Sequence, residues 1–316
     1  MADKKIIAVV GATGSQGGGL VRAILDDPRG EFVARALTRD TASAKAKALA
    51  DRGAEVVAAD VGDVQSLERA FDGAFGAFCV TFFWHHFSPD QEKAQARAMA
   101  QAAKSARLQH VIWSTLEDTR QWVPLNDDRM PTLMGEYKCP HFDAKGEADQ
   151  FFTDLALPTT FLLTTFYWDN FITSGMGPRT APDGSLVLAL PMADAPLAGI
   201  AVEDIGRCAY GVFRRGRELI GRRVGIAGEL LTGEQMAAAF SRVLGRPVRY
   251  EPMTPAAYRK LGFPGAEDLG NMFQIYAECA SEFARTRDVR VARELDPQLE
   301  TFDEFLERNR DRIRIE

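Results

Sequence analysis

The chain has 316 residues, of which 46% are hydrophobic and 26% charged, and its net charge is −6. These proportions are ordinary for a globular protein and exclude a disordered, collagenous or coiled-coil chain, and the length predicts about two domains at ~150 residues each. Both halves of the chain are acidic, which disfavours binding of nucleic acid through phosphate neutralisation. We therefore expect no direct sequence-specific contact with nucleic acid.

The cysteines and the apolar runs indicate a cellular compartment. The four cysteines are widely spaced, and this pattern favours free thiols in a reducing environment over a disulfide framework or a zinc site. Near the start, the apolar run 6–10 is too short for a signal peptide or a membrane-spanning helix. We expect a cytoplasmic protein without a metal site or a membrane association.

The first half of the chain alternates between strands and helices. Short apolar runs predict strands at residues 5–10, 32–37, 55–59, 76–80 and 110–114. Helical spacing after the first run, and again at 42–51, 64–71 and 89–106, predicts the helices between them. Regular alternation of this kind is typical of βαβ units, so we predict an α/β fold with a doubly wound parallel Rossmann sheet.

The second half is less regular. Residues 118–138 include a stretch without periodicity, which predicts a loop or flap, and a helix at 142–154 and a strand at 159–164 follow. Beyond these we expect a smaller α+β lobe. Its predicted strands are 186–190, 223–226 and 248–250, and its predicted helices are 204–213, 233–244, 255–261, 266–279 and 302–310. This divides the chain into a dinucleotide-binding domain at 1–158 and a C-terminal lobe at 159–316 that closes the cleft, with some later segments returning to the sheet.

A glycine-rich turn lies between the first strand and the first helix. Gly11, Gly14 and Gly17 form a Gly-x-x-Gly-x-x-Gly pattern that also contains Thr13, Ser15 and Gln16. Glycine permits a tight turn and close approach of the backbone to a pyrophosphate, and the following helix directs free N–H groups at that anion. The strand, turn and helix occur in the order that this motif requires. The alternative is a tight turn that binds nothing.

Arg39 ends the second predicted strand, where an NAD-selective site would carry a carboxylate. A guanidinium at this place suits the 2′-phosphate of NADP by charge and geometry, and Ser43 and Lys45 could add contacts to that phosphate. Asp40 next to it weakens the inference, and Arg39 could be an ordinary surface arginine.

Two further groups follow the third and fourth strands. Asp60 could accept a hydrogen bond from the adenine amino group while Val61 packs on the ring, although Asp60 could instead cap a helix. Thr81, Phe82 and Phe83 come at the carboxyl end of the fourth strand, where open α/β sheets bind ligands. They could line a nicotinamide pocket or serve in ordinary core packing.

The last group contains Ser114, at the end of the fifth strand, and the pair His141 and Lys145, which share one face of a helix. Lys145 could hold the nicotinamide ribose, and Ser114 could orient a substrate oxygen. The alternatives are a hydrogen-bonded helix histidine and a solvated lysine.

These motifs together resemble the NmrA-like family of atypical short-chain dehydrogenases, most closely its redox-sensing members. The resemblance runs nearly end to end and is carried by residues 10–18, 80–84, 141–147, 167–170, 181–184, 260–266 and 271–273. It implies an NADP(H) site in which Gly11 to Gln16 hold the pyrophosphate, Arg39 the 2′-phosphate, Asp60 and Val61 the adenine, Thr81 to Phe83 the nicotinamide side and Lys145 its ribose. Tyr167, Trp168, Asp169 and Asn170 would close the site from the C-terminal lobe.

The chain departs from this family pattern at several positions. Its relatives have a basic residue where Ser43 stands and a lysine where Ala94 aligns, and the insert at 120–138 is longer here. Active short-chain dehydrogenases use a Tyr-x-x-x-Lys pair, whereas here His141 occupies the tyrosine position and only Lys145 remains.

The resemblance therefore favours an NADP(H)-binding redox sensor with little or no turnover, acting through a regulatory protein partner. The alternative is an NADPH-dependent oxidoreductase that reduces a small carbonyl, enone or aromatic substrate. In that case Lys145, His141 and Ser114 would be its catalytic residues, as in related isoflavone-reductase-like enzymes that rely on a lysine without the tyrosine. A homodimer is compatible with either function.

Overall fold

The computed structural model describes residues 4–315, and seven strands form its central sheet. Every neighbouring pair of strands in this sheet is parallel, which confirms the predicted doubly wound architecture. In spatial order the strands are β11 (Arg223–Gly225), β6 (Thr159–Leu163), β5 (His110–Thr115), β4 (Gly76–Cys79), β1 (Lys5–Val9), β2 (Phe32–Thr38) and β3 (Glu55–Ala58). The winding direction reverses between β1 and β4, and ligands of such sheets bind at this point.

Helices cover both faces of the sheet because its strands are apolar on both sides. Ile7 and Val9 of β1 pack into one buried cluster, and Ala8 and Val10 pack into the other. The first face carries α1 (Ser15–Leu25), α2 (Ala44–Asp51), α7 (Val202–Arg215) and α12 (Val289–Leu295). The second face carries α3 (Val64–Phe71), α4 (Pro89–Ser105) and α5 (Pro140–Asp154).

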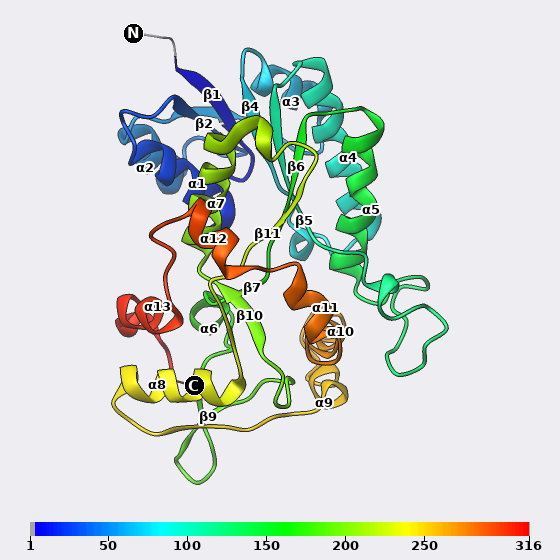
Figure 1. Ribbon diagram of the computed structural model, residues 1–316, viewed down its shortest axis with the longest axis vertical. Coiled ribbons are helices and arrows are strands. Elements are labelled where there is room, and N and C mark those ends of the chain that lie inside the picture. The colour runs from blue at the N-terminus through cyan, green and yellow to red at the C-terminus, as the bar shows by residue number, and fades with distance from the viewer. Residues whose placement is uncertain (1–3, 316) are drawn as a thin grey trace.

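The remaining elements form a smaller unit below the sheet in Figure 1. It contains one sheet of β7 (Phe166–Tyr167), β10 (Leu197–Ile200) and β12 (Glu229–Leu231), and a second of β8 (Arg179–Thr180), β9 (Leu186–Leu188) and β13 (Val248–Tyr250). Its helices are α6 (Asn170–Thr173), α8 (Gly233–Leu244), α9 (Pro255–Arg259), α10 (Ala266–Glu278), α11 (Ala280–Arg285) and α13 (Phe302–Arg308). We call this the small unit, and the seven-stranded sheet with its helices the large unit.

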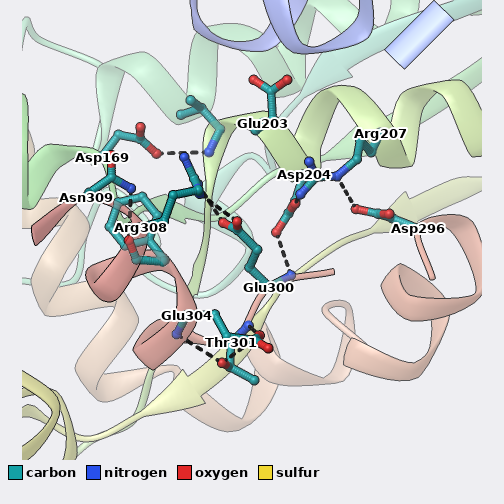
Figure 2. Close-up of polar contacts among 12 residues, drawn as sticks. Asp169, Glu203, Asp204, Arg207, Asp296, Glu300, Thr301, Glu304, Arg308 and Asn309 are labelled. Atoms are coloured by element: carbon teal, nitrogen blue, oxygen red, sulfur yellow. Dashed lines mark hydrogen bonds and ion pairs between the residues drawn. The ribbon is translucent and has the colours of Figure 1, made fainter. Parts of the chain in front are cut away.

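The C-terminal segment of the small unit is fastened to α7 of the large unit by ion pairs (Figure 2). Arg207 on α7 contacts both Asp204 and Asp296, with 2.9 Å from its Nε to the Asp296 carboxylate. The second oxygen of Asp204 accepts from the backbone N–H of Glu300 at 3.0 Å. Glu300 in turn pairs with Arg308 at 2.6 Å.

The predicted elements of the large unit all occur, with ends that shift by a few residues. The helix predicted at 42–51 begins at Ala44 because the Ser43 side chain accepts a hydrogen bond from the backbone N–H of Ala46 and caps it. Residues 118–136 are mostly loop, but they contain a short 3-10 turn (Thr119–Gln121) and a bridge between Leu133 and Tyr137.

Elements that the sequence pattern did not predict lie after residue 165. They are β7, β8, β10, β12, α6, α11 and α12. In addition β6, β11 and α7, which all follow residue 158, lie with the large unit, so that unit takes in segments from both sides of the expected boundary. The ends of the two expected domains at residues 1–3 and 316 lie outside the described residues.

No helix among residues 4–315 is both long enough and apolar enough to cross a membrane.

Candidate functional site

A cavity of about 1020 Å³ opens at the carboxyl edge of the central sheet, between the large and small units. Its walls combine the glycine turn, the segment after β4, one face of α5 and the apolar side of the small unit. The large unit contributes Gly11, Gly14, Ser15, Gln16, Gly17, Val80, Thr81, Phe82, Phe83, Trp84, Leu116, His141, Phe142 and Lys145, and the remaining wall includes Tyr167, Asn170, Met253, Tyr258, Leu269, Met272 and Tyr276.

The glycine turn leaves the start of α1 open toward this cavity. Gly11 has φ +66°, a conformation that favours glycine, and its carbonyl accepts from the N–H of Gly14 at 2.8 Å. A Cβ on Gly17 would come within 2.6 Å of the carbonyl oxygens of Val10 and Gly11, so only glycine fits there. No side chain caps α1, and its first N–H groups are free to bind an anion.

Lys145 is held on the cavity wall by two side chains. Its Nζ donates to Thr81 Oγ1 at 2.5 Å and pairs with the carboxylate of Glu92 at 2.8 Å. Thr81 also donates to Glu92, and His86 Nε2 lies 3.4 Å from the other Glu92 oxygen. These contacts fix the ammonium group in one place.

Glu92 is fully buried, at 0% exposure, on the first turn of α4. Burial alone would raise the pKa of this carboxyl, but the charge of Lys145, the proximity of His86 and hydrogen bonds from Lys145 and Thr81 outweigh burial and lower the pKa to about 2. Glu92 is therefore ionised throughout the neutral range and holds Lys145 as an ammonium ion.

His141 forms the second polar group of the wall. Its Nδ1 lies 2.7 Å from Oδ1 of Asp268 on α10, and its backbone N–H donates to Oδ2 of the same carboxylate at 3.2 Å. The thiol of Cys139 also donates to Asp268, at 3.2 Å. Burial, reinforced by the charges of Asp268 and Asp143, raises the pKa of Cys139 well above its usual value, so the thiol keeps its proton.

Cys139, His141 and Asp268 place one donor atom each within 4.8 Å of one another, a grouping that could hold a metal ion. The hydrogen bonds above already account for all three groups. We therefore treat the cluster as a hydrogen-bonded one.

A chain of hydrogen bonds connects the end of β5 to the small unit. Ser114 Oγ donates to Gln16 Oε1 at 2.7 Å, and Gln16 Nε2 donates to the hydroxyl of Tyr167 at 2.6 Å. Ser114 is buried and does not line the cavity, so its hydroxyl orients Gln16 rather than a substrate oxygen. Burial raises the pKa of Tyr167, which keeps its hydroxyl protonated.

Aromatic side chains surround His141. The ring centroid of Trp84 lies 4.7 Å from that of His141, and the centroid of Phe83 lies 6.0 Å away. Phe82 is 63% exposed at the cavity, although its large apolar ring would ordinarily be covered. These groups give the cavity an apolar, flat-walled character that suits an aromatic ligand.

Seven of the residues expected to bind a cofactor lie outside the cavity lining. Two of them are Trp168 and Asp169, and the other five are Thr13, Arg39, Ser43, Asp60 and Val61. Arg39 is exposed after β2, and Asp60 follows β3, at the same edge of the sheet as the glycine turn. Asp60 accepts from the N–H of Gly62 at 2.8 Å, and the cap of α3 is Asp63 instead.

The segment Tyr167 to Asn170 is split between the cavity and the core. Tyr167 and Asn170 line the cavity, whereas Trp168 is buried against Phe302 and Phe305. The carboxylate of Asp169 accepts from the backbone N–H of Val202 at 3.0 Å at the start of α7, where Figure 2 shows it. The structure therefore does not bring Trp168 and Asp169 to the cavity.

Two acidic residues of the site, Glu92 and Asp268, were not singled out from the sequence. Glu92 lies in the run Asp90 to Lys93, which is typical of a solvated first helical turn. Asp268 lies in the first turn of α10, where an acid commonly interacts with the helix dipole. Neither position carries a local signal of burial.

The fold and the site together define a Rossmann-type protein with a ligand cavity between two units. The sequence profile of the NmrA-like family matches residues 3–306. The chain belongs to the NmrA-like family.

Its relatives include both enzymes and regulators. The NmrA-like family domain-containing oxidoreductase FrzB of Cladobotryum sp. is 29% identical over 292 residues, which cover 85% of this chain and 82% of the relative. The nitrogen metabolite repression protein nmr of Neurospora crassa is 32% identical over 192 residues, covering 58% of this chain and 36% of that protein.

Among known structures, NmrA, a negative transcriptional regulator, in complex with NADP superposes with a TM-score of 0.78. It is 27% identical, with 96% of this chain and 95% of that chain covered. The Citrobacter sp. triphenylmethane reductase complexed with NADP(H) shares the fold at 18% identity and a TM-score of 0.74.

Proposed function

We propose that this protein is an NADPH-dependent oxidoreductase that reduces an aromatic carbonyl or enone compound. One observation carries the proposal. The cavity extends beyond the glycine turn into an apolar region of the small unit, lined by Met253, Tyr258, Leu269 and Met272, and Lys145 lies on its wall. A protein that only bound a dinucleotide would not need this additional space.

The residues at the start of α1 fit a dinucleotide. The uncapped N–H groups after Gly14 suit a pyrophosphate, and the glycines leave room for its close approach. Arg39 makes no ion pair among residues 4–315 and is available to a 2′-phosphate. The family resemblance and the NADP complex of NmrA support the same cofactor.

When bound, NADPH supplies a hydride. The chain's own residues bind the dinucleotide and orient it. Glu92 and Thr81 hold the Lys145 ammonium group on the cavity wall, where it suits the nicotinamide ribose. Gln16 connects the glycine turn to Tyr167 of the small unit, and the aromatic rings beside His141 give this part of the wall an apolar surface.

A redox sensor is the second candidate. It is favoured by the likeness to a transcriptional regulator and by His141, which replaces the tyrosine of active short-chain dehydrogenases and is itself bound to Asp268. In this function, NADP(H) would shift the small unit relative to the large one and change a surface seen by a protein partner.

The test is NADPH consumption by the purified protein with a panel of aromatic aldehydes, enones and quinones. We expect turnover of at least one class, and we expect Lys145→Met to lose most of it. Lys104→Met, which removes an exposed lysine on α4, should leave turnover unchanged. If NADPH binds and changes protease sensitivity but no panel member is reduced, the reductase proposal is wrong and the sensor is favoured.

A further inference from the structure

The geometry points to His141 as the proton donor to the substrate oxygen, with Asp268 as the residue that positions it. This inference rests on the proposed function and narrows its substrate class to compounds that acquire negative charge on an oxygen atom. The pair joins the two units, because His141 is on α5 and Asp268 is on α10.

The orientation of the imidazole follows from its partners. An ionised carboxylate can only accept hydrogen bonds, so Nδ1, at 2.7 Å from Asp268 Oδ1, carries the proton of that bond. Nε2 forms no hydrogen bond among the described residues and is not among their buried unpaired atoms, so it is accessible. Since His141 lines the cavity, Nε2 is the nitrogen available to a ligand.

Lys145 is the less suitable proton donor. Its Nζ is committed to Thr81 and to the ionised Glu92, and loss of its proton would leave that buried carboxylate without its cation. His141 differs from Lys145, because Nε2, the nitrogen that would release the proton, has no hydrogen-bond partner among the described residues, and Nδ1–H stays bonded to Asp268 after the release.

The proton step balances as follows. The carbonyl carbon of the substrate gains a hydride supplied by NADPH, a C–H bond forms, and the electron pair of the C=O π bond moves to oxygen. An O–H bond then forms on that oxygen as the Nε2–H bond of the His141 imidazolium breaks. The neutral histidine keeps Nδ1–H on Asp268, and after the alcohol leaves, a proton taken up from solvent forms the Nε2–H bond again.

The variant Asp268→Asn gives a sharp test because its orientation is fixed by the backbone. The N–H of His141 donates to Oδ2 of Asp268, and this N–H cannot become an acceptor. We therefore expect the carboxamide oxygen at that position, which turns the NH₂ group toward Nδ1 and toward the Cys139 thiol, whose sulfur can accept as well as donate. His141 is then forced to carry its proton on Nε2, and Nδ1 becomes an acceptor.

The first measurement does not depend on activity. Nitrogen-15 NMR of histidine-labelled protein, with and without NADPH, reports which ring nitrogen of His141 carries the proton. The chain has four histidines, so His141→Gln assigns the signal. We expect a proton on Nδ1 of His141 in the wild type, alone in the neutral ring and together with Nε2–H in the imidazolium. In Asp268→Asn we expect the neutral ring to carry its proton on Nε2. A wild-type neutral ring with its proton on Nε2, or a variant that leaves the tautomer unchanged, would overturn the assignment.

The second measurement is reduction of an aromatic aldehyde. We expect His141→Gln and Asp268→Asn each to lower kcat by about 10²–10⁴-fold, with NADPH affinity and thermal stability close to wild type. His110→Gln is the matched control, because it removes a buried histidine that contacts Thr160 outside the cavity.

The outcomes separate the two proposals. Turnover that His141→Gln leaves unchanged would overturn the role of the pair while the reductase function stands. Absence of turnover in the wild type with the whole panel would remove the reductase function and the proton step with it.

Discussion

At the residue scale, Lys145 depends on Glu92. A buried lysine without a counter-ion would be costly, and Glu92 lies 2.8 Å from it with no exposed surface. The carboxylate thus fixes both the charge and the place of the group that the family resemblance assigns to the nicotinamide ribose.

The pair of Lys145 and Glu92 predicts that the free energy of unfolding falls in the acidic pH range. The pKa of Glu92 is lowered from 4.5 to about 2, because the charge of Lys145 and the hydrogen bonds outweigh burial. A lowered pKa stabilises the folded state above the unfolded value, and that contribution, on the order of 3 kcal/mol, is lost as the pH falls from 4.5 toward 2. In urea unfolding, the advantage of the wild type over Glu92→Gln should therefore shrink across this window. An advantage that does not change with pH would contradict the ion pair.

A second prediction concerns the glycine turn. A Cβ at position 17 would overlap two backbone carbonyls, so Gly17→Ala must displace the turn and weaken NADPH binding by at least about tenfold, as expected for the loss of one charge-assisted hydrogen bond. At position 18 a Cβ would meet the flexible Arg22 guanidinium at 3.1 Å and the Ala12 carbonyl oxygen at 3.2 Å. These neighbours need to move by only a few tenths of an ångström, so Gly18→Ala should bind NADPH much more nearly like the wild type than Gly17→Ala. Titration of both variants with NADPH checks this, and equal affinity at the two positions would count against the turn as the pyrophosphate site.

At the scale of elements, the link between α11 and α12 fastens the ends of two sheet strands. Arg287 lies in this link with no exposed side-chain surface, pairs with Glu117 after β5, and donates to the carbonyl of Thr164 after β6 at 2.7 Å. Its guanidinium also lies 3.9 Å from the ring centroid of Phe283. Thr164 lines the cavity, so this buried pair sets the position of one wall.

Removal of either Arg287 or Glu117 should therefore strongly destabilise the fold. Arg287→Ala leaves Glu117 as an uncompensated buried charge, and we expect a loss of about 3–5 kcal/mol in the free energy of unfolding. Arg242→Ala, which breaks an exposed pair with Asp303, is the matched control and should have little effect. Similar losses in the two variants, measured by urea unfolding, would show that the buried pair has no special role.

The length of the strands determines which of them the sequence could predict. The strands from Lys5 to Leu163 are continuous apolar runs separated by helical spacing, and the sheet they form was predicted correctly. By contrast β7 has two residues and β12 has three, too few to show a period. Such strands exist because the small unit pairs them, which is information that no local pattern contains.

The site was predictable to a similar degree. The glycine turn and Lys145 are marked by spacing, and the structure brings both to the cavity. Glu92 and Asp268 are far from their partners in sequence and stand at helix starts, where acids are common, so only the fold shows that they are buried beside Lys145 and His141.

At the scale of the whole molecule, polar contacts run from α1 through α7, both in the large unit, to the C-terminal segment of the small unit. Arg22 on α1 pairs with Glu203 on α7 at 2.5 Å, and close packing of Gly19 against Gly206 brings these helices together. The C-terminal segment is then bound to α7 through Asp204 and Arg207 (Figure 2). A displacement of α7 would therefore also move α1, the helix that follows the glycine turn.

The carboxyl of Asp204 in this junction predicts that the free energy of unfolding changes with pH up to the neutral range. Burial raises the pKa of Asp204 to about 7, since the opposing charge of Arg207 is shared with Asp296 and Glu300 lies nearby. Between the ordinary pKa of 3.8 and about 7, the folded state then binds more protons than the unfolded state, so this group's contribution to stability falls as the pH rises through that range.

We therefore expect Asp204→Asn to remove part of the loss of stability between about pH 5 and about pH 7. Asp51→Asn, at an exposed position on α2, should behave like the wild type. Urea unfolding at several pH values, with amide exchange of residues 296–309, provides the comparison. A pH profile that is identical in the wild type and Asp204→Asn would show that this carboxyl does not titrate in the neutral range.

The measurement that tests the central claim most directly is calorimetric titration of the purified protein with NADPH and with NADH. We predict one NADPH bound per chain, a clear preference for NADPH over NADH, and a loss of about 10–100-fold in that preference in Arg39→Ala, because one charge-assisted contact to the 2′-phosphate disappears. Arg52→Ala, which removes an exposed arginine after α2, should keep the preference. Failure to bind either dinucleotide, or a preference that Arg39→Ala leaves intact, would contradict the account.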